Sequence, residues 1–195
     1  MTDTVIRPKF HHVNLKTTRL QEMIDFYREL VGAEVTFQDQ AGAWLSNDDA
    51  NHRIALLAFP NFVDDPEKET RTGMHHSAFE YGSFEALNST YLRLREAAIA
   101  PALCLDHGMT LSYYYADPDG NNVELQVDTF GSWEKSKEWM QTSDEFKANP
   151  IGVFVDPDQV AADHAEGLGF EDIHAKAMAG GYAPDQAPVA IPEVS

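Results

Sequence analysis

Two copies of one short pattern follow each other in the chain, each a strand-like run that opens with histidine and leads into a helix-like stretch. His12 opens the first run, and His76 opens the second run 64 positions later. A tyrosine follows each histidine at the same distance, because Tyr27 and Tyr91 each lie 15 residues further on. A repeat of this kind constrains the fold strongly, since both copies are expected to form the same structural unit.

The later part of each copy matches as well. A turn-prone segment at 47–51 precedes an apolar, strand-like stretch, and the segment 117–121 does the same in the second copy. The offset between these parts is 70 rather than 64, so the second copy carries six extra residues, which we assign to a loop between its middle strands. In this alignment Ile54 is the counterpart of Glu124.

The first copy is expected to form a strand, a helix and three more strands. Residues 9–16 have the alternating pattern of a strand. Thr18 and Gln21 form a capping-box pair at the start of a helix with one apolar face. Three more strands are predicted near 33–38, 41–46 and 52–59.

The second copy is expected to repeat this order, with a strand at 74–81, a helix from Ser83 to about Ala98, and strands near 102–105, 110–116 and 122–127. The predicted fold class is therefore α+β, in which two βαβββ modules form a curved mixed sheet around a metal-containing cavity. The modules span about 8–60 and 72–128 of a domain at 1–128, and residues 129–195 form a C-terminal helical extension and an irregular tail.

Within this extension, residues 133–146 look helical, and Asp156 with Pro157 makes a cap and first-turn pair for a short helix through Ala165. Glycine and proline favour an irregular tail from Ala179 onward, at Gly180, Gly181, Pro184, Pro188 and Pro192. We expect the extension to serve packing or subunit contact rather than catalysis, and the chain to form a homo-oligomer.

Composition limits the location and the partners. With 195 residues, 43% of them hydrophobic, the chain can bury a core of its own. The single cysteine, Cys104, excludes an internal disulfide, and the absence of a signal segment or a long apolar run leads us to expect a cytoplasmic protein. A formal net charge of -18 disfavours nucleic acid and anionic membranes as partners, because both are polyanions.

Strand alternation selects the candidate ligands among the histidines. Val13 and Leu15 must face the helix, which leaves His12, rather than His11, on the opposite face. The same alternation in the second copy favours His76 over the histidine before it. Both chosen histidines are therefore expected to face the cavity.

A carboxylate is expected on the same side. In the last strand Val123 and Leu125 form the core face, so Glu124 points the other way. Taken singly, a strand histidine is more often a hydrogen-bonded structural residue, and Glu124 could be an outward residue of an edge strand. Their joint placement at repeat positions favours a metal site of His12, His76 and Glu124, the two-histidine, one-carboxylate set of non-haem Fe(II) oxygenases.

Three motifs carry these ligands: Phe10-His11-His12-Val13, His75-His76-Ser77-Ala78-Phe79 and Asp117-Pro118-Asp119-Gly120-Asn121-Asn122-Val123-Glu124. They resemble the metal-ligand motifs of the vicinal oxygen chelate (glyoxalase/bleomycin resistance/dioxygenase) superfamily. Within it the chain resembles the type I extradiol ring-cleavage dioxygenases, the group that contains catechol 2,3-dioxygenase and 2,3-dihydroxybiphenyl 1,2-dioxygenase. The resemblance covers about residues 8–128. The better-known members have two such domains, so this chain resembles the shorter, single-domain members.

The resemblance implies Fe(II), with Mn(II) as the alternative, and cleavage of a catechol-type ring next to its diol by O2. It also implies three catalytic residues. His52 resembles the acid–base histidine, Tyr114 stands three residues before Asp117 like the active-site tyrosine, and His107 lies near a further pocket histidine, although its spacing does not match cleanly. From the residues alone, His52 shares a strand face with Ile54 and should face the cavity, although a solvent-exposed loop histidine is the more common case. Tyr114 could likewise be an ordinary aromatic strand residue.

Two other functions stay open at this point. One is a glyoxalase-like isomerase or thiol transferase of the same fold, which commonly uses a fourth protein ligand from the first unit. This chain has Ile54 there, which cannot bind metal. The other is a non-enzymatic module that sequesters an aromatic drug and would have no need of the three ligands.

Overall fold

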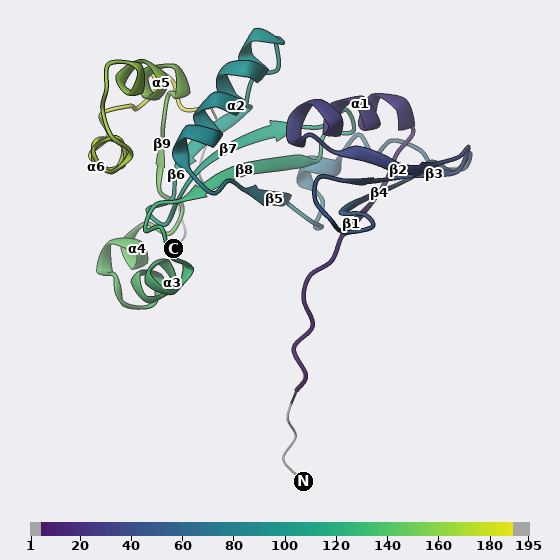
Figure 1. The fold of residues 1–195 in the computed structure, drawn as a ribbon, viewed down its shortest axis with the longest axis horizontal. Coiled ribbons are helices and arrows are strands. Elements are labelled where there is room, and N and C mark those ends of the chain that lie inside the picture. Colours follow the sequence, from purple (N-terminus) through teal and green to yellow (C-terminus); the bar gives the residue numbers. More distant parts are fainter. Residues whose placement is uncertain (1–4, 189–195) are drawn as a thin grey trace. The chain divides into compact units, whose positions relative to one another are not determined.

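The computed structural model describes residues 5–188 of the chain (Figure 1). The chain divides into two compact units, each described here by itself. Unit 1 comprises Met1–Gly73 and Asp117–Gly120, and unit 2 comprises Met74–Ala116 and Asn121–Ser195. Among the described residues, no helix is long and apolar enough to cross a membrane.

Unit 1 is built on a four-stranded mixed sheet with the order β1-β4-β3-β2. Its elements are β1 (Val13–Lys16), α1 (Leu20–Val31), β2 (Glu34–Gln38), β3 (Gly42–Ser46), β4 (Ile54–Leu57) and the short 3₁₀ helix η1 (Lys68–Thr70). The outer strand β1 runs parallel to β4, and the remaining pairs are antiparallel. Helix α1 packs on β3 and β4 (Figure 1), which gives the predicted strand–helix–three-strand order.

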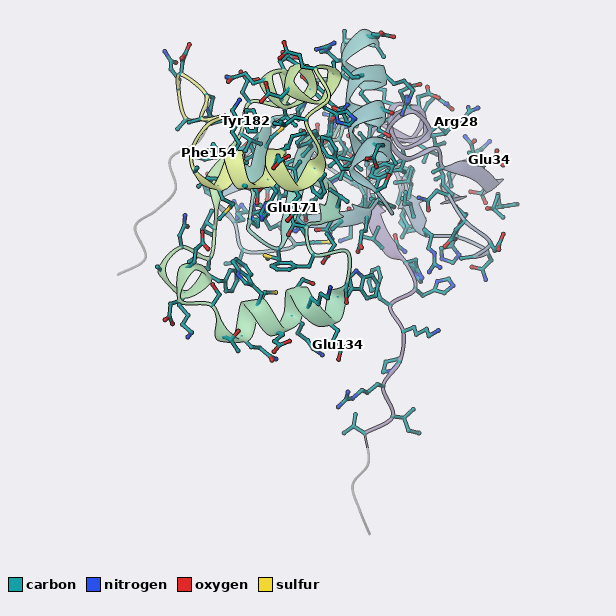
Figure 2. The ribbon with its side chains drawn as sticks, turned by 60° about the vertical axis from the view of Figure 1, so that its left-hand side comes forward. Arg28, Glu34, Glu134, Phe154, Glu171 and Tyr182 are labelled. Atoms are coloured by element: carbon teal, nitrogen blue, oxygen red, sulfur yellow. The ribbon has the colours of Figure 1, made fainter. Side chains whose placement is uncertain are left out.

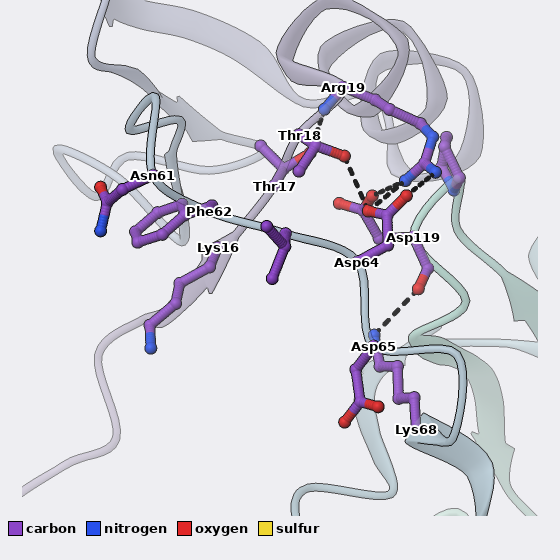
Figure 3. A pocket seen from close by; sticks show the side chains of 12 residues that line it. Lys16, Thr17, Thr18, Arg19, Asn61, Phe62, Asp64, Asp65, Lys68 and Asp119 are labelled. Carbon is purple, nitrogen blue, oxygen red and sulfur yellow. Dashed lines mark hydrogen bonds and ion pairs between the residues drawn. The ribbon is translucent and has the colours of Figure 1, made fainter.

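The predicted capping box at the start of α1 was wrong. Arg19, not Thr18, is the N-cap residue, and its side chain makes no capping hydrogen bond. The hydroxyl of Thr18 donates instead to Asp64 Oδ1 at 2.8 Å (Figure 3). The Gln21 amide donates to Asp25. The Asp64 carboxylate is a strong acceptor for the Thr18 hydroxyl, and the sequence pattern could not show that a loop brings Asp64 to this position.

The buried face of α1 consists of Met23, Ile24, Tyr27 and Leu30, which the helical period predicts. Leu20 and Val31, predicted for the same face, are half-buried. Tyr27 is fully buried, and its hydroxyl donates to Asp117 Oδ2 at 3.1 Å. Burial, together with the negative charge of Asp117, raises the pKa of Tyr27, so the phenol stays protonated and remains a donor. This bond holds the segment Asp117–Gly120 within unit 1.

Unit 2 repeats the arrangement and extends it by one strand, in the order β5-β8-β7-β6-β9. Its first elements are β5 (His76–Glu80), α2 (Phe84–Glu96), β6 (Leu103–Asp106), β7 (Thr110–Ala116) and β8 (Asn122–Asp128). Again the first strand of the repeat runs parallel to the last, β5 to β8. Ser83 caps α2, because its side chain accepts from the Ala86 amide.

The C-terminal extension is also part of unit 2, with α3 (Trp133–Thr142), α4 (Asp144–Ala148), β9 (Val153–Phe154), α5 (Pro157–Ala165) and α6 (Phe170–Met178). The single helix predicted at 133–146 is in fact two, because Ser143 ends α3 and its hydroxyl caps α4 by accepting from Phe146. The predicted cap of α5 is confirmed, since Asp156 accepts from the Asp158 amide. Strand β9 and helix α6 were not predicted.

Tyr182 anchors the end of the extension (Figure 2). Its side chain is fully buried, and its hydroxyl donates to Asp163 Oδ2 at 2.7 Å. Its carbonyl accepts from the Asp156 amide at 2.7 Å, and Lys176 Nζ lies 4.5 Å from the ring centroid. Residues 179–188 form no helix or strand, as expected, and Pro192 lies outside the described residues.

The predicted α+β class is confirmed: two mixed βαβββ-like sheets are followed by C-terminal helices. The predicted cavity concerns both units together and stays a prediction, as does the domain boundary at residue 128.

Candidate functional site

Glu124 lies at the centre of the candidate site in unit 2. On β8 its neighbours Val123 and Leu125 are fully buried, and α2 packs on this strand, so alternation places Glu124 on the opposite face. Strand pairing puts Tyr114 of β7 directly opposite Glu124 and Ala78 of β5 beside it. The carboxylate is 4% exposed, so its hydrogen-bond partners decide its charge state.

Four of the predicted site residues form one hydrogen-bonded chain in unit 2. His76 Nε2 lies 3.0 Å from Glu124 Oε2. The Tyr114 hydroxyl donates to the other carboxylate oxygen, Oε1, at 2.9 Å. His107 Nε2 lies 2.9 Å from the same hydroxyl. The structure therefore brings His76, Glu124, Tyr114 and His107 together, including His107, whose spacing in the sequence was the least regular.

The charges of this chain are complementary. Burial raises the pKa of Glu124, but hydrogen bonds with His76, Ser112 and Tyr114 outweigh it and leave the pKa below its ordinary value. The bond to Glu124 raises the pKa of His76. Burial and the charge of Glu124 raise the pKa of Tyr114, so its phenol stays neutral. Glu124 is therefore an ionised acceptor whose charge favours the protonated form of His76, and Tyr114 is a neutral donor to it.

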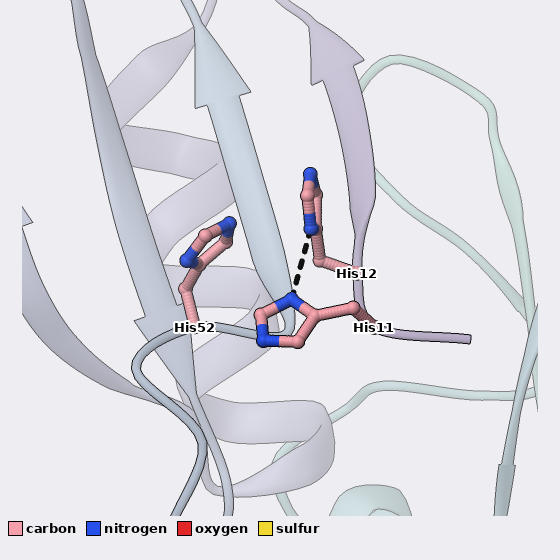
Figure 4. A group of neighbouring side chains, drawn as sticks. All are labelled: His11, His12 and His52. Carbon is pink, nitrogen blue, oxygen red and sulfur yellow. Dashed lines mark hydrogen bonds between the residues drawn. The ribbon is translucent and has the colours of Figure 1, made fainter. Parts of the chain in front are cut away.

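Unit 1 holds a second group of histidines. The ligand atoms of His11, His12 and His52 all lie within 4.8 Å of one another (Figure 4). His11 Nδ1 and His12 Nδ1 are 3.0 Å apart, and the ring centroids of His12 and His52 are 4.4 Å apart. Partial burial and the neighbouring imidazoles lower the pKa of His52, which favours its neutral form.

Parallel pairing of β1 with β4 brings these histidines together, because Val13 pairs with Ile54 and the chain enters both strands at the same end. Arg53 fixes the entry to β1. Its guanidinium donates to the His11 carbonyl at 2.9 Å and forms an ion pair with Asp48 at 2.8 Å. The hydrogen bonds that Asp48 accepts from Arg53 and from the Ala50 amide lower the pKa of Asp48 to about 2, so this carboxylate stays ionised at neutral pH.

The predicted equivalence of Ile54 and Glu124 was wrong by one residue. In unit 2, Ala78 pairs with Glu124, and in unit 1 its repeat counterpart Asn14 pairs with Ala55. Ala55 is thus the counterpart of Glu124, while Ile54 is fully buried in the core. With Ala55 in this position the offset is 69, so the second copy carries five extra residues up to this point rather than six. They do not lie between its middle strands as predicted, because the loop between β6 and β7 is no longer than the loop between β2 and β3. Alanine has no ligand atom either, so the absence of a fourth ligand from this position stands.

The predicted placement of His52 on a strand face was therefore wrong as well. His52 lies in the irregular segment before β4 rather than on a strand face shared with Ile54. Its nearness to His12 comes from this segment. His12 and His52 belong to unit 1 and the other four candidates to unit 2, so the joining of His12 to His76 and Glu124 stays a prediction.

Three residues that lie near the candidates were not predicted as site residues: His11, His75 and Ser112. His75 Nδ1 lies 2.8 Å from His76 Nδ1, which repeats the contact between His11 and His12 in unit 1. Strand alternation had excluded His11 and His75 as ligands, although the pair of adjacent histidines in each copy was already a signal for placing both at the site. Ser112, which is fully buried, interacts with Glu124. Its position two residues before Tyr114 on one strand could have revealed it.

A separate pocket of about 640 Å³ in unit 1 contains none of the predicted site residues (Figure 3). It lies at the far end of β1 from His12 and includes Lys16, Arg19 and Lys68. Arg19 is paired with Asp64 and Asp119, and Lys68 Nζ donates to the Asp119 carbonyl at 3.0 Å. Arg19 and Lys68 thus already have partners within the chain, and Lys16 Nζ lies 5.7 Å from the centroid of the Phe62 ring. We therefore look for the chemistry at the histidine and carboxylate groups.

Comparison with known proteins identifies the family. Residues 9–125 match the model of the Glyoxalase/Bleomycin resistance protein/Dioxygenase superfamily. The chain is 35% identical over 178 residues to biphenyl-2,3-diol 1,2-dioxygenase 2 of Rhodococcus globerulus, covering 91% of this chain and 93% of that one. It is 33% identical over 174 residues to biphenyl-2,3-diol 1,2-dioxygenase 3 of the same organism, covering 89% and 91%.

A solved structure shares the fold. The crystal structure of a glyoxalase/dioxygenase from Nostoc punctiforme superposes with a TM-score of 0.53 at 22% identity, over 66% of this chain and 99% of that one. The match of the family model to more than half of the sequence confirms the resemblance found in the motifs. The chain belongs to the glyoxalase/bleomycin resistance protein/dioxygenase superfamily.

Proposed function

We propose that this protein is an extradiol dioxygenase, which opens a catechol-type ring next to its diol with O2. The observation that carries the proposal is the Glu124 carboxylate, buried on a strand and shared between His76 and Tyr114. The similarity over nine tenths of the chain to two biphenyl-2,3-diol dioxygenases supports it and favours 2,3-dihydroxybiphenyl or a similar catechol as substrate.

The donor atoms fit a divalent ion. Two ligands that meet at a right angle, each about 2.1 Å from an ion, are about 3.0 Å apart. His76 Nε2 and Glu124 Oε2 are separated by 3.0 Å, so an ion can take the place of the proton that now joins them. We propose that His12 supplies the third ligand. When bound, Fe(II), or alternatively Mn(II), supplies open coordination positions and lowers the pKa of the diol hydroxyls.

The remaining residues handle protons and orientation. Tyr114 is a neutral donor beside Glu124 and is suited to hydrogen-bond an oxygen of the diol. His107 contacts the same hydroxyl and fixes where it points. His52 has a lowered pKa, so its neutral imidazole is suited to accept a proton from a diol hydroxyl and to return it on ring opening.

Replacing His52 by phenylalanine is expected to lower kcat by about 10² to 10⁴ while iron stays bound, because a general base is removed but no ligand is lost. Turnover of 2,3-dihydroxybiphenyl and iron content by mass spectrometry measure both effects. His11→Phe is the matched control, since His11 belongs to the same histidine group of unit 1. Equal turnover in the two variants would remove His52 from the mechanism.

The activity itself is tested by anaerobic loading with Fe(II), followed by air and a panel of catechol, 3-methylcatechol and 2,3-dihydroxybiphenyl. We expect one O2 consumed per diol and a yellow ring-opened product, with no reaction of hydroquinone, whose hydroxyls are not adjacent. Failure of every catechol to consume O2 would reject the proposal. Isomerisation of a glutathione hemithioacetal would instead support a glyoxalase-like function, and metal-independent binding of an aromatic drug would support a binding module.

A further inference from the structure

The C-terminal extension surrounds the turn that carries His107. Strand β9 pairs antiparallel with β6, so that Phe154 lies opposite Leu105 and Val153 opposite Asp106 (Phe154 is labelled in Figure 2). This pairing brings the residues just before β9 to the start of the turn at His107. The extension thus does more than cover the edge of the sheet.

The main contact is between a backbone carbonyl and the His107 ring. His107 Nδ1 lies 2.6 Å from the carbonyl oxygen of Ile151. A carbonyl can only accept a hydrogen bond, so Nδ1 must carry a proton. The other ring nitrogen, Nε2, then faces the Tyr114 hydroxyl at 2.9 Å. The neutral form with its proton on Nε2 is excluded in this arrangement.

The carbonyl of Ile151 is held by its neighbours. Gly152 has a φ of 90°, and a Cβ atom there would lie 2.0 Å from the Asp106 carbonyl oxygen and 2.7 Å from His107 Cα. The Asn149 side chain bonds both backbone groups of Gly152, donating to its carbonyl at 2.8 Å and accepting from its amide at 3.1 Å. Glycine is therefore required where the extension meets the turn.

Helices α3 and α6 of the extension also contact the turn at His107, through the residues on either side of it. The Asp106 carboxylate is fully buried and lies 2.7 Å from His174 Nδ1 of α6. Gly108 has a φ of 85°, and a Cβ atom there would lie 2.3 Å from the Trp139 ring of α3. Residues from α3, α6 and the segment before β9 thus converge on three consecutive residues.

We infer that the extension is a positioning element of the active site: the Ile151 carbonyl accepts a hydrogen bond from the protonated Nδ1 of His107, which fixes the ring and directs its Nε2 to the Tyr114 hydroxyl. This inference rests on the proposed function for its catalytic meaning. It revises the expectation that the extension serves packing or subunit contact alone. Ile151 acts through His107 and touches no reacting atom.

The proton on Nδ1 of His107 can be detected without any turnover. In the full chain with ¹⁵N-labelled histidine, loaded with diamagnetic Zn(II), long-range ¹H–¹⁵N spectra should show a protonated Nδ1 for His107. Gly152→Ala should shift this signal, and Asn149→Ala, which leaves the backbone free of a clash, should weaken it. Gly167→Ala is the matched control, since Gly167 is an extension glycine with a φ of 99° and no atom within 4 Å of an added Cβ. An unprotonated Nδ1 in the unchanged chain would overturn the inference.

Kinetics then test the coupling. Gly152→Ala is expected to lower kcat for 2,3-dihydroxybiphenyl by about 10-fold to 100-fold at unchanged iron content, the range for a misplaced catalytic group. In a His107→Asn background the same substitution should cause no further loss, because its effect passes through His107. Additive losses of kcat in the double variant, or equal losses of kcat in Gly152→Ala and Gly167→Ala, would overturn the inference. If no catechol is cleaved, the proposed function fails, while the spectra still decide the role of Ile151.

Discussion

Replacing His76 by alanine is expected to remove iron from the protein and to abolish ring cleavage. His76 Nε2 and Glu124 Oε2 are 3.0 Å apart, the spacing of two ligands of one ion. Loss of an outer partner of a ligand already costs about 10-fold to 100-fold in metal affinity, so loss of a ligand should cost more than about 100-fold. Iron content after anaerobic loading and desalting, together with oxygen uptake, measures the result.

His75→Ala is the matched control for this substitution. His75 has the same side chain, one position away, and lies 2.8 Å from His76 through its own Nδ1. The salt bridge to Glu124, however, comes from His76. We therefore expect His75→Ala to keep iron when Fe(II) is saturating and to keep most of its turnover. Equal iron content in the two variants would show that His76 is not a ligand.

Replacing His12 by alanine is expected to have an effect of the same size, because the proposed ion needs a ligand from unit 1. His11, His12 and His52 lie close enough for any of them to be that ligand (Figure 4). The repeat selects His12, which occupies the position of His76 in the other copy. His12→Ala should therefore lose iron and turnover, whereas His11→Ala should keep both within a few-fold.

The double variant His12→Ala/His76→Ala gives a sharper test of a shared ion. If both histidines hold the same ion, removing the second should add little, because the site is already lost. Full iron binding in His12→Ala would contradict the proposed ligand set, and an effect confined to His11→Ala would move the third ligand to His11. Circular dichroism melting curves check that each variant is folded.

The order of the elements could be predicted because it depends on local patterns. Strand alternation placed Glu124 on the face opposite the core, and the strand register puts Tyr114, which the resemblance indicated, directly opposite it. The buried face of α1 followed from helical periodicity in the same way. Each of these features is set by residues close to one another in the sequence.

Features that depend on distant partners were not predictable. The exact pairing of β1 with β4, which makes Ala55 the counterpart of Glu124, depends on loop lengths that a fixed repeat offset cannot give. Helix α6 begins after Gly169 without a capping side chain, and the stacking of Phe170 on Phe84 of α2 supports its first turn. Tertiary contacts thus determine where a helix begins when the sequence carries only a weak signal for its start.

Tyr182 sets a limit on how far the protein can be shortened from its C-terminus. Its ring, hydroxyl and carbonyl all contact other residues of the extension. A protease that cuts before Tyr182 would therefore remove a buried aromatic side chain and a hydrogen-bond donor to Asp163. A cut or a fused tag beyond it leaves these contacts intact. Since the same extension holds the turn of His107, trimming past this tyrosine is expected to loosen a group far away in the sequence, and an affinity handle belongs after it.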